Sequence, residues 1–167
     1  YDNLPRGNSL HRVCRSYAHI SKSISFAELN NESSRIASGL NQYGLKKGTR
    51  VLLLVPFKIE FISIAFALFK AGAVPILIDP GLGVKNTLKC IEEVDPQGII
   101  ATPIIHAISK IFRKPFLNVK YRVTIGPRWF PGDKSLKDIH SMAERKPTYV
   151  NVLPDDPAAI LFTSGST

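Results

Sequence analysis

The sequence predicts an α/β fold in which a parallel sheet carries helices on both faces. Short apolar runs of strand length alternate along the chain with longer segments of helical periodicity. In the clearest unit, the runs at 50–55 and 74–78 flank an apolar helical segment at 57–70, and parallel neighbours need a crossover of this kind. Ligands in such sheets bind at the carboxyl ends of the strands, so the segments that follow the strands are the first candidates for a site.

The first helix is expected to begin at a capping box. Ser25-Phe26-Ala27-Glu28 has the S-x-x-E form, in which the serine hydroxyl accepts from the backbone N–H of the glutamate and the carboxylate reaches back. Apolar residues recur after it at roughly helical spacing: Phe26, Leu29, Ile36, Ala37 and Leu40. Gly44 follows as a C-terminal stop.

The apolar run at 50–55 is typical of a parallel strand buried on both faces, and Pro56 ends it. The segment at 57–70 is apolar on nearly every side, so we expect Phe57 and the aromatic residues from Phe61 to Phe69 to belong to the core rather than to an acyl pocket. The remaining elements follow in order: strand 74–78, turn 79–83, helix 84–94, strand 98–101, helix 103–112, strand 121–125, a long connection 126–157 with a short helix at 136–145, and strand 158–162.

Length and composition indicate one ordinary globular core. The chain has 167 residues and 44% hydrophobic content, which suits a domain or a subdomain of something larger. Cys14 and Cys90 stand far apart without a C-x-x-C, so we expect no disulfide framework or zinc site, and a reducing, cytoplasmic compartment. The histidines lack metal-ligand spacing, so we expect each to be structural or on the surface.

No membrane span or leader is expected. The longest apolar stretch, Ile59 to Phe69, contains Glu60 and falls short of the roughly 20 residues that a bilayer span needs. No basic, apolar and small-residue sequence typical of a signal peptide opens the chain at Tyr1.

The region 110–137 is strongly basic within a chain of net charge +9, and Asp133 is its only acid. Such a field attracts nucleic acid, anionic lipid or phosphorylated ligands, although a solvated face would look the same. No nucleic-acid motif accompanies the charge, so we expect no nucleic-acid partner and keep peripheral membrane contact as a prediction.

The segment that leaves the last strand consists only of small hydroxylated residues and one glycine: Thr163, Ser164, Gly165, Ser166 and Thr167. Backbone N–H groups and hydroxyls of such a segment can converge on phosphate oxygens, while a plain turn or helix cap has the same composition. The Walker pattern G-x-x-x-x-G-K-[ST] and the dinucleotide pattern G-x-G-x-x-G are both absent.

The run from Ala158 to Thr167 resembles the start of the signature loop T-S-G-S-T-G-x-P-K-G of the acyl-CoA synthetase, adenylation-domain and luciferase superfamily. Three earlier segments resemble family motifs in the same order: Ser25 to Leu29 (L-T-Y-x-E-L), Gly48 to Val51 (G-D-R-V), and Phe69 to Pro80 (K-A-G-A-x-x-x-P-x-D-P). The chain is therefore identified as a member of this AMP-forming superfamily over about residues 20 to 167.

Within the superfamily, Phe66 to Pro75 and Ile78 to Asn86 are similar to the fatty-acid CoA ligase-like group that includes β-lactone synthetases of olefin biosynthesis. Asp79-Pro80-Gly81 departs from the more general D-P-x-x-P or D-x-x-Y-P pattern. We expect Asp79 to be a turn residue that holds the sheet edge.

The resemblance implies a ligase that uses ATP and Mg²⁺ to convert a carboxylic acid, fatty or β-hydroxy, into an acyl-adenylate. The acyl group then passes to an acceptor such as CoA, or the adenylate closes on the substrate's own β-hydroxyl. By motif match the segment 163–167 grips the β- and γ-phosphates, and no catalytic residue or metal ligand lies within the chain. The chain is expected to be an N-terminal subdomain, 1–167, truncated within that loop and inactive alone.

Two further functions stay open on the sequence. One is a carrier-protein-dependent adenylation domain, whose specificity residues would lie downstream. The other is a non-catalytic, basic nucleotide-binding domain, which the net charge of +9 and the Ser/Thr segment would also suit.

Overall fold

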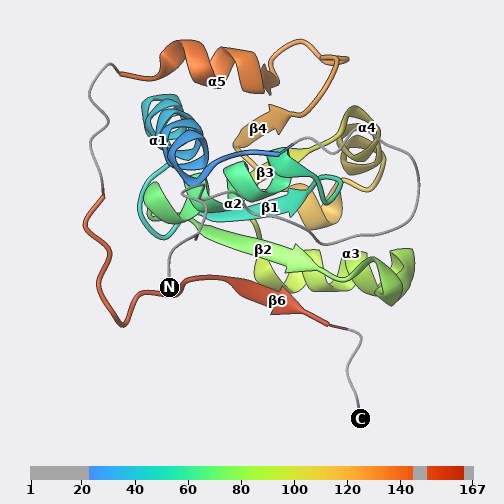
Figure 1. The fold of residues 1–167 in the computed structure, drawn as a ribbon. Helices are drawn as coiled ribbons and strands as arrows, with labels where there is room; N and C mark the ends of the chain where they lie inside the picture. The colour runs from blue at the N-terminus through green and yellow to red at the C-terminus, as the bar shows by residue number, and fades with distance from the viewer. Residues whose placement is uncertain (1–22, 145–149, 164–167) are drawn as a thin grey trace, which may run out of the picture.

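The computed structural model describes residues 23–144 and 150–163, which form a six-stranded parallel sheet with the strand order β5-β4-β3-β1-β2-β6 (Figure 1). The strands are β1 (Arg50–Leu54), β2 (Val74–Ile78), β3 (Gly98–Ala101), β4 (Tyr121–Thr124), β5 (Lys134–Ser135) and β6 (Ile160–Phe162). All five neighbouring pairs run parallel, as the sequence predicted for the sheet. Their carboxyl ends therefore share one edge.

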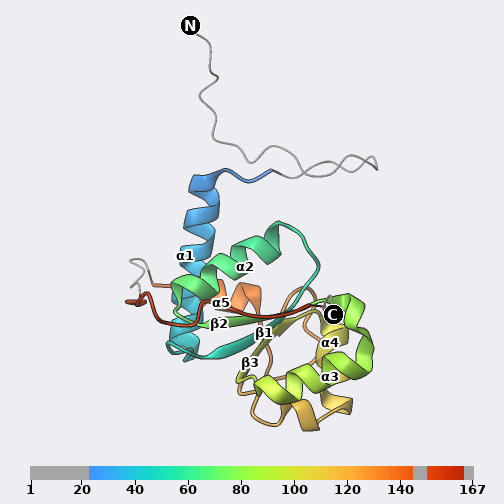
Figure 2. The same ribbon diagram turned by 90° about the horizontal axis from the view of Figure 1, so that it is seen from below.

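Helices cover both faces of the sheet, which confirms the predicted fold class (Figures 1 and 2). The helices are α1 (Phe26–Tyr43), α2 (Ile59–Lys70), α3 (Gly83–Val94), α4 (Pro103–Ile111) and α5 (Leu136–Met142), with short 3₁₀ turns η1 (Pro80–Leu82) and η2 (Lys114–Phe116). Side chains of α1, α2 and α5 share one core cluster with the sheet, and those of α3, α4 and η2 share the other.

The alternation of side chains along β1 shows how the two clusters form. Val51 and Leu53 lie in the cluster of α1 and α2, whereas Leu52 lies in the cluster of α3. All three are almost fully buried, because a parallel strand with helices on both faces has no solvent side. The continuous apolar run in the sequence follows from this double burial.

The predicted capping box at the start of α1 is confirmed. The Ser25 hydroxyl accepts from the backbone N–H of Glu28 at 3.2 Å, and the Ser25 N–H donates to the Glu28 carboxylate at 2.8 Å. The two hydrogen bonds that Ser25 donates to this carboxylate, from its N–H and from its hydroxyl at 2.7 Å, hold the pKa of Glu28 below its usual range. Gly44 ends the helix in the left-handed conformation, with φ of 109°.

The expectation that the aromatic residues of 57–70 form core is wrong for Phe57, Phe66 and Phe69, which are all exposed. Helix α2 instead buries two small residues, Ser63 and Ala67, together with Ile64 and Leu68. Helix α1 faces α2 and α5 with small residues too, because Ser33, Ser34, Ala37, Ser38 and Gly39 are all buried. The helix layer is close-packed, so the bulky rings turn outward.

The connection 126–157 contains one strand that the sequence did not predict. Strand β5 pairs through Lys134 with Val123 of β4, and the expected helix follows it in a shorter form as α5. Asp133, just before β5, is buried beside His106 of α4, with 3.6 Å between carboxylate and ring nitrogen. The other ring nitrogen of His106 lies 3.1 Å from the Val123 carbonyl, so this histidine is structural as expected.

Among residues 23–144 and 150–163, no helix is both long and apolar enough to cross a bilayer.

Replacing Gly39 by alanine tests the contact between α1 and α5. A Cβ at this position would overlap the backbone carbonyl of Ile139, so we expect a loss of roughly 1–3 kcal/mol in the free energy of unfolding. Helix propensity alone would give the opposite sign, a gain of about 1 kcal/mol. Urea unfolding followed by circular dichroism measures the difference, and a Gly39→Ala variant as stable as the parent would contradict the packing described here.

Candidate functional site

The carboxyl edge of the sheet opens into a crevice between β1, β2 and β3. The chain leaving β1 enters α2 on one face, whereas the chains leaving β2 and β3 enter α3 and α4 on the other face. Connections that diverge in this way leave a gap at the strand ends, where parallel sheets bind ligands.

A cavity of about 590 Å³ lies at this divergence. It is lined by Leu53, Leu54, Val55, Pro56, Phe57, Phe61, Leu77, Ile78, Asp79, Pro80, Thr87, Thr102 and Ile105. The walls are mostly apolar, and the polar side chains come from Asp79 and two threonines. A mostly apolar concavity with a few polar groups is the usual form of a small-molecule site.

Asp79 holds the turn at the end of β2, which agrees with its predicted role. Its carboxylate accepts from the backbone N–H of Gly81 at 2.9 Å and caps the η1 turn. Its own N–H donates to the carbonyl of Phe162 at 2.9 Å, one step beyond the last paired residues of β2 and β6. The residue therefore ties the exits of two neighbouring strands together.

Thr163 leaves β6 at the same edge and is exposed to solvent. It follows directly on Phe162, whose carbonyl is bonded to Asp79, so this member of the predicted phosphate segment lies beside the turn. Ser164, Gly165, Ser166 and Thr167 lie outside the described residues. The hydroxyl of Thr163 suits a phosphate oxygen, and the grip of the whole segment stays a prediction.

The described residues do not form a metal site of three or more ligands. Within 23–144 and 150–163, no group of three or more His, Cys, Asp or Glu side chains is arranged to hold one.

Sequence reasoning missed most of the cavity wall. The rings of Phe57 and Phe61 lie 4.8 Å apart and line the cavity; Phe61 also packs against the core as expected, whereas Phe57 does not. Thr102 directly follows β3, and that position after a strand is the signal that would have found it. Thr87 lies one turn inside α3, where nothing in its spacing distinguishes it from a surface residue.

The model of the AMP-binding enzyme family matches residues 7–167. The chain belongs to the AMP-binding enzyme family. Among its members, the olefin β-lactone synthetase of Xanthomonas campestris is 38% identical over 146 residues, which are 86% of this chain and 26% of that protein. The olefin β-lactone synthetase of Stenotrophomonas maltophilia is 34% identical over 145 residues, again 86% of this chain and 26% of that protein. The chain thus spans about a quarter of the length of these AMP-binding relatives.

Solved structures of AMP-binding enzymes have the same fold. A long-chain-fatty-acid-CoA ligase from Archaeoglobus fulgidus superposes with a TM-score of 0.76 at 21% identity, covering 92% of this chain and 30% of that one. An anthranilate CoA ligase in complex with anthranoyl-AMP also gives 0.76, at 19% identity over 87% of this chain and 28% of that one. These similarities establish the fold and agree with the parallel sheet described above.

Asp79 variants test the side-chain cap at the turn that follows β2. We expect Asp79→Ala to lower the free energy of unfolding by about 1 kcal/mol, because the cap of η1 is lost. Asp79→Asn keeps an acceptor for the Gly81 N–H and is expected to retain most of that stability. Denaturant titration of both variants gives the comparison, and equal losses in the two would mean that the charge of Asp79, rather than the cap, matters.

Proposed function

We propose that the chain supplies the phosphate-binding edge of an enzyme that activates a carboxylic acid with ATP. The observation that carries the proposal is the exit of β6 into Thr163 at the carboxyl edge, beside the turn of Asp79 and the 590 Å³ cavity. Membership of the AMP-binding family supports it. The segment 163–167 would contact the β- and γ-phosphates.

In the proposed reaction a carboxylate oxygen of the acid attacks the α-phosphorus of ATP. The bond from that phosphorus to the β-phosphate bridging oxygen breaks, and pyrophosphate leaves with the bonding electron pair. Hydroxyls and N–H groups that hold the β- and γ-phosphates orient this leaving group and stabilise its charge. Mg²⁺ bound to ATP would neutralise further phosphate charge.

For the acid we propose a fatty or β-hydroxy acid. The olefin β-lactone synthetases at 38% and 34% identity favour a reaction in which the substrate's own β-hydroxyl attacks the acyl carbon and displaces AMP. The solved CoA ligases favour transfer to the thiol of CoA as the alternative. A carrier-protein-dependent adenylation domain is a third candidate.

Two proposals about the chain as a whole accompany this function. Residues 1–167 would form an N-terminal subdomain that ends within the phosphate-binding segment and is inactive alone, since the chain spans only about a quarter of its relatives. A cytoplasmic location would suit the low cysteine content and the unpaired Cys90.

The activity test is pyrophosphate release by the complete enzyme that contains this chain. We expect release with Mg-ATP and a fatty or β-hydroxy acid, and a decrease on the order of 10²-fold in Thr163→Val, which loses one donor to phosphate. Ser141→Ala on α5 removes a hydroxyl far from this edge and serves as the control. Dependence on added CoA separates the ligase from the lactone synthetase, and absence of release with every acid, amino acids included, would favour a non-catalytic nucleotide-binding domain.

A second proposal is peripheral contact of the basic region 110–137 with an anionic membrane surface. Helix α4 supports it, because this helix buries polar residues and exposes apolar ones. His106 and Ser109 are 0% and 1% exposed, whereas Ile104 and Ile111 are 60% and 74% exposed. Two isoleucines of this amphipathic helix thus face solvent, while Ile105 packs against the core.

Ser109 and one ring nitrogen of His106 make hydrogen bonds to strand β4, so the orientation of α4 has a structural cause. The Ser109 hydroxyl donates to the carbonyl of His106 at 2.8 Å and accepts from the Arg122 guanidinium at 2.9 Å. On the outside, Leu117 continues the exposed apolar surface. Lys110, Arg113 and Arg122 line a pocket of about 470 Å³ beside it, and no carboxylate is among the residues that line it.

Apolar side chains with cations at their rim are typical of surfaces that rest in the headgroup layer of anionic membranes. Each Lys or Arg near such a surface contributes about 1 kcal/mol, an attraction that salt screens. The exposed face of α4 and η2 has both components.

Vesicle co-sedimentation tests this contact. We expect the protein to bind phosphatidylglycerol vesicles, not phosphatidylcholine vesicles, and to lose about tenfold in affinity in Ile111→Ser, since a buried apolar side chain contributes roughly 1.5–3 kcal/mol. Val84→Ser on α3 replaces another exposed apolar residue and is the matched control. Equal binding to both lipids, or equal losses in the two variants, would refute the proposal.

A further inference from the structure

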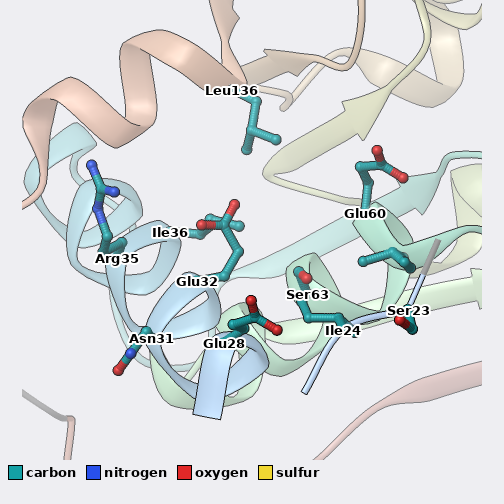
Figure 3. A pocket seen from close by; sticks show the side chains of 11 residues that line it. Ser23, Ile24, Glu28, Asn31, Glu32, Arg35, Ile36, Glu60, Ser63 and Leu136 are labelled. Carbon is teal, nitrogen blue, oxygen red and sulfur yellow. The ribbon is translucent and has the colours of Figure 1, made fainter. Parts of the chain in front are cut away.

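A separate pocket of about 420 Å³ lies between the first turns of α1 and α2, next to the start of α5 (Figure 3). It is lined by Ser23, Ile24, Glu28, Asn31, Glu32, Arg35, Ile36, Ile59, Glu60, Ser63 and Leu136. None of these residues lines the cavity at the carboxyl ends of β1 to β3. The pocket is therefore distinct from the candidate phosphate edge.

The pocket is acidic within a basic chain. Glu28, Glu32 and Glu60 line it against the single cation Arg35, whereas the chain as a whole carries a net charge of +9. A local excess of carboxylates that reverses the sign of the whole protein attracts cations to this one place.

The three carboxylates differ in their partners. Glu28 bonds the Ser25 cap, which holds its pKa below the usual range and keeps it ionised at neutral pH. Glu32 lies 3.1 Å from a ring nitrogen of His140. Glu60 makes no hydrogen bond or ion pair with any other residue that the structure describes, and its side chain is exposed at the pocket.

Ser63 gives the second, independent indication of a ligand. It is only 3% exposed, and within the described part of the chain its hydroxyl has no hydrogen-bond partner. Ser33 and Ser34 on α1 donate to carbonyls one turn earlier, as helical serines commonly do, and Ser63 does not. Buried hydroxyls are normally bonded, and an unpaired one is costly.

Glu60 and Ser63 lie three residues apart on α2 and so face the same side of that helix. Figure 3 shows the Ser63 hydroxyl on the pocket wall between the side chains of Glu32 and Glu60. A ligand atom near this wall would meet a hydroxyl acceptor and a carboxylate together.

The chemistry of the lining selects the class of cation. Within the described residues no group of three or more His, Cys, Asp or Glu side chains is arranged to hold a metal ion. The side chains of Ile36, Ile59 and Leu136 supply apolar walls instead. An ammonium group on a hydrocarbon stem matches both parts, because it has three donors and no acceptor.

We propose that this pocket binds a primary alkylammonium ion. The ammonium donates to the Ser63 hydroxyl and to the Glu60 carboxylate, Glu28 and Glu32 add negative charge, and the alkyl chain lies against Ile59 and Leu136. The binding is independent of the proposed acid activation.

Isothermal titration with n-hexylamine hydrochloride at pH 7.5 tests the site, with n-hexanol as the uncharged comparison. We expect saturable binding of the amine, about tenfold weaker in Glu60→Gln and in Ser63→Ala, since hydrogen bonds to charged groups contribute at this level. Glu93→Gln on α3 removes an exposed carboxylate elsewhere and is expected to leave the affinity unchanged.

Stability without amine supplies a second readout. Because the Ser63 hydroxyl is unpaired, Ser63→Ala is expected to unfold at the same or a higher urea concentration than the parent. Weaker amine binding in this variant would then not result from misfolding. No saturable heat, equal binding of hexanol, an equal loss in Glu93→Gln, or binding of Mg²⁺ or Ca²⁺ in place of the amine would each overturn the proposal.

Discussion

The register between β2 and β6 is the constraint on which the candidate site depends. Ile76, Leu77 and Ile78 pair with the three residues of β6, and the bond from the Asp79 N–H to the Phe162 carbonyl extends the ladder by one step. A slip of one residue would turn Ile160 and Phe162 away from the α3 side of the sheet and move Thr163 from the edge. The geometry of the phosphate segment therefore begins in the pairing of two short strands.

The helix layer formed by α1, α2 and α5 packs on the face of the sheet opposite α3. Small buried residues let these helices approach closely, and Lys70 adds a polar tie between them. Its ammonium donates to the Asn30 carbonyl at 2.9 Å, to the Ser33 hydroxyl at 2.8 Å and to the Ser34 hydroxyl at 2.9 Å. One cation thus joins the end of α2 to the first half of α1, just before the chain turns into β2. The pocket with Glu60 and Ser63 lies where the same two helices begin, at the opposite end of α2 from this tie.

Sequence patterns predicted the elements well where a local signal exists. The capping box at Ser25, the stop at Gly44 and the doubly buried run of β1 each depend on neighbouring residues, and each was confirmed. Strand β5 was missed because two residues are too few for any periodicity, and its place depends on pairing with β4. The aromatic residues of α2 were assigned to the core because apolar character alone does not tell which face of a helix packs closely.

The candidate site divides in the same way. Thr163 was predicted from composition and from a family resemblance, and its place at the carboxyl edge follows from the parallel topology. The cavity wall contains Phe57, Thr87 and Thr102, which come from the segments after three different strands. No spacing in the sequence predicts that these residues lie together. Ser63 is another such case. That its buried hydroxyl lacks a hydrogen-bond partner follows only from the packing of the neighbouring helix and not from the sequence.

The two edges of the sheet are held by different means, and this difference bears on function. At one edge, β5 follows the buried Asp133, and α5 covers the strands beside it. At the other, Ile160 and Phe162 pack only partly, and Leu161 is 65% exposed. Within the described residues, Ile160 and Phe162 pack partly against the cluster of α3, and backbone hydrogen bonds to β2 and to Asp79 fix the direction of β6. An edge strand fixed mainly by backbone pairing keeps its direction, and so aims the segment that follows it, even where its side chains are not enclosed.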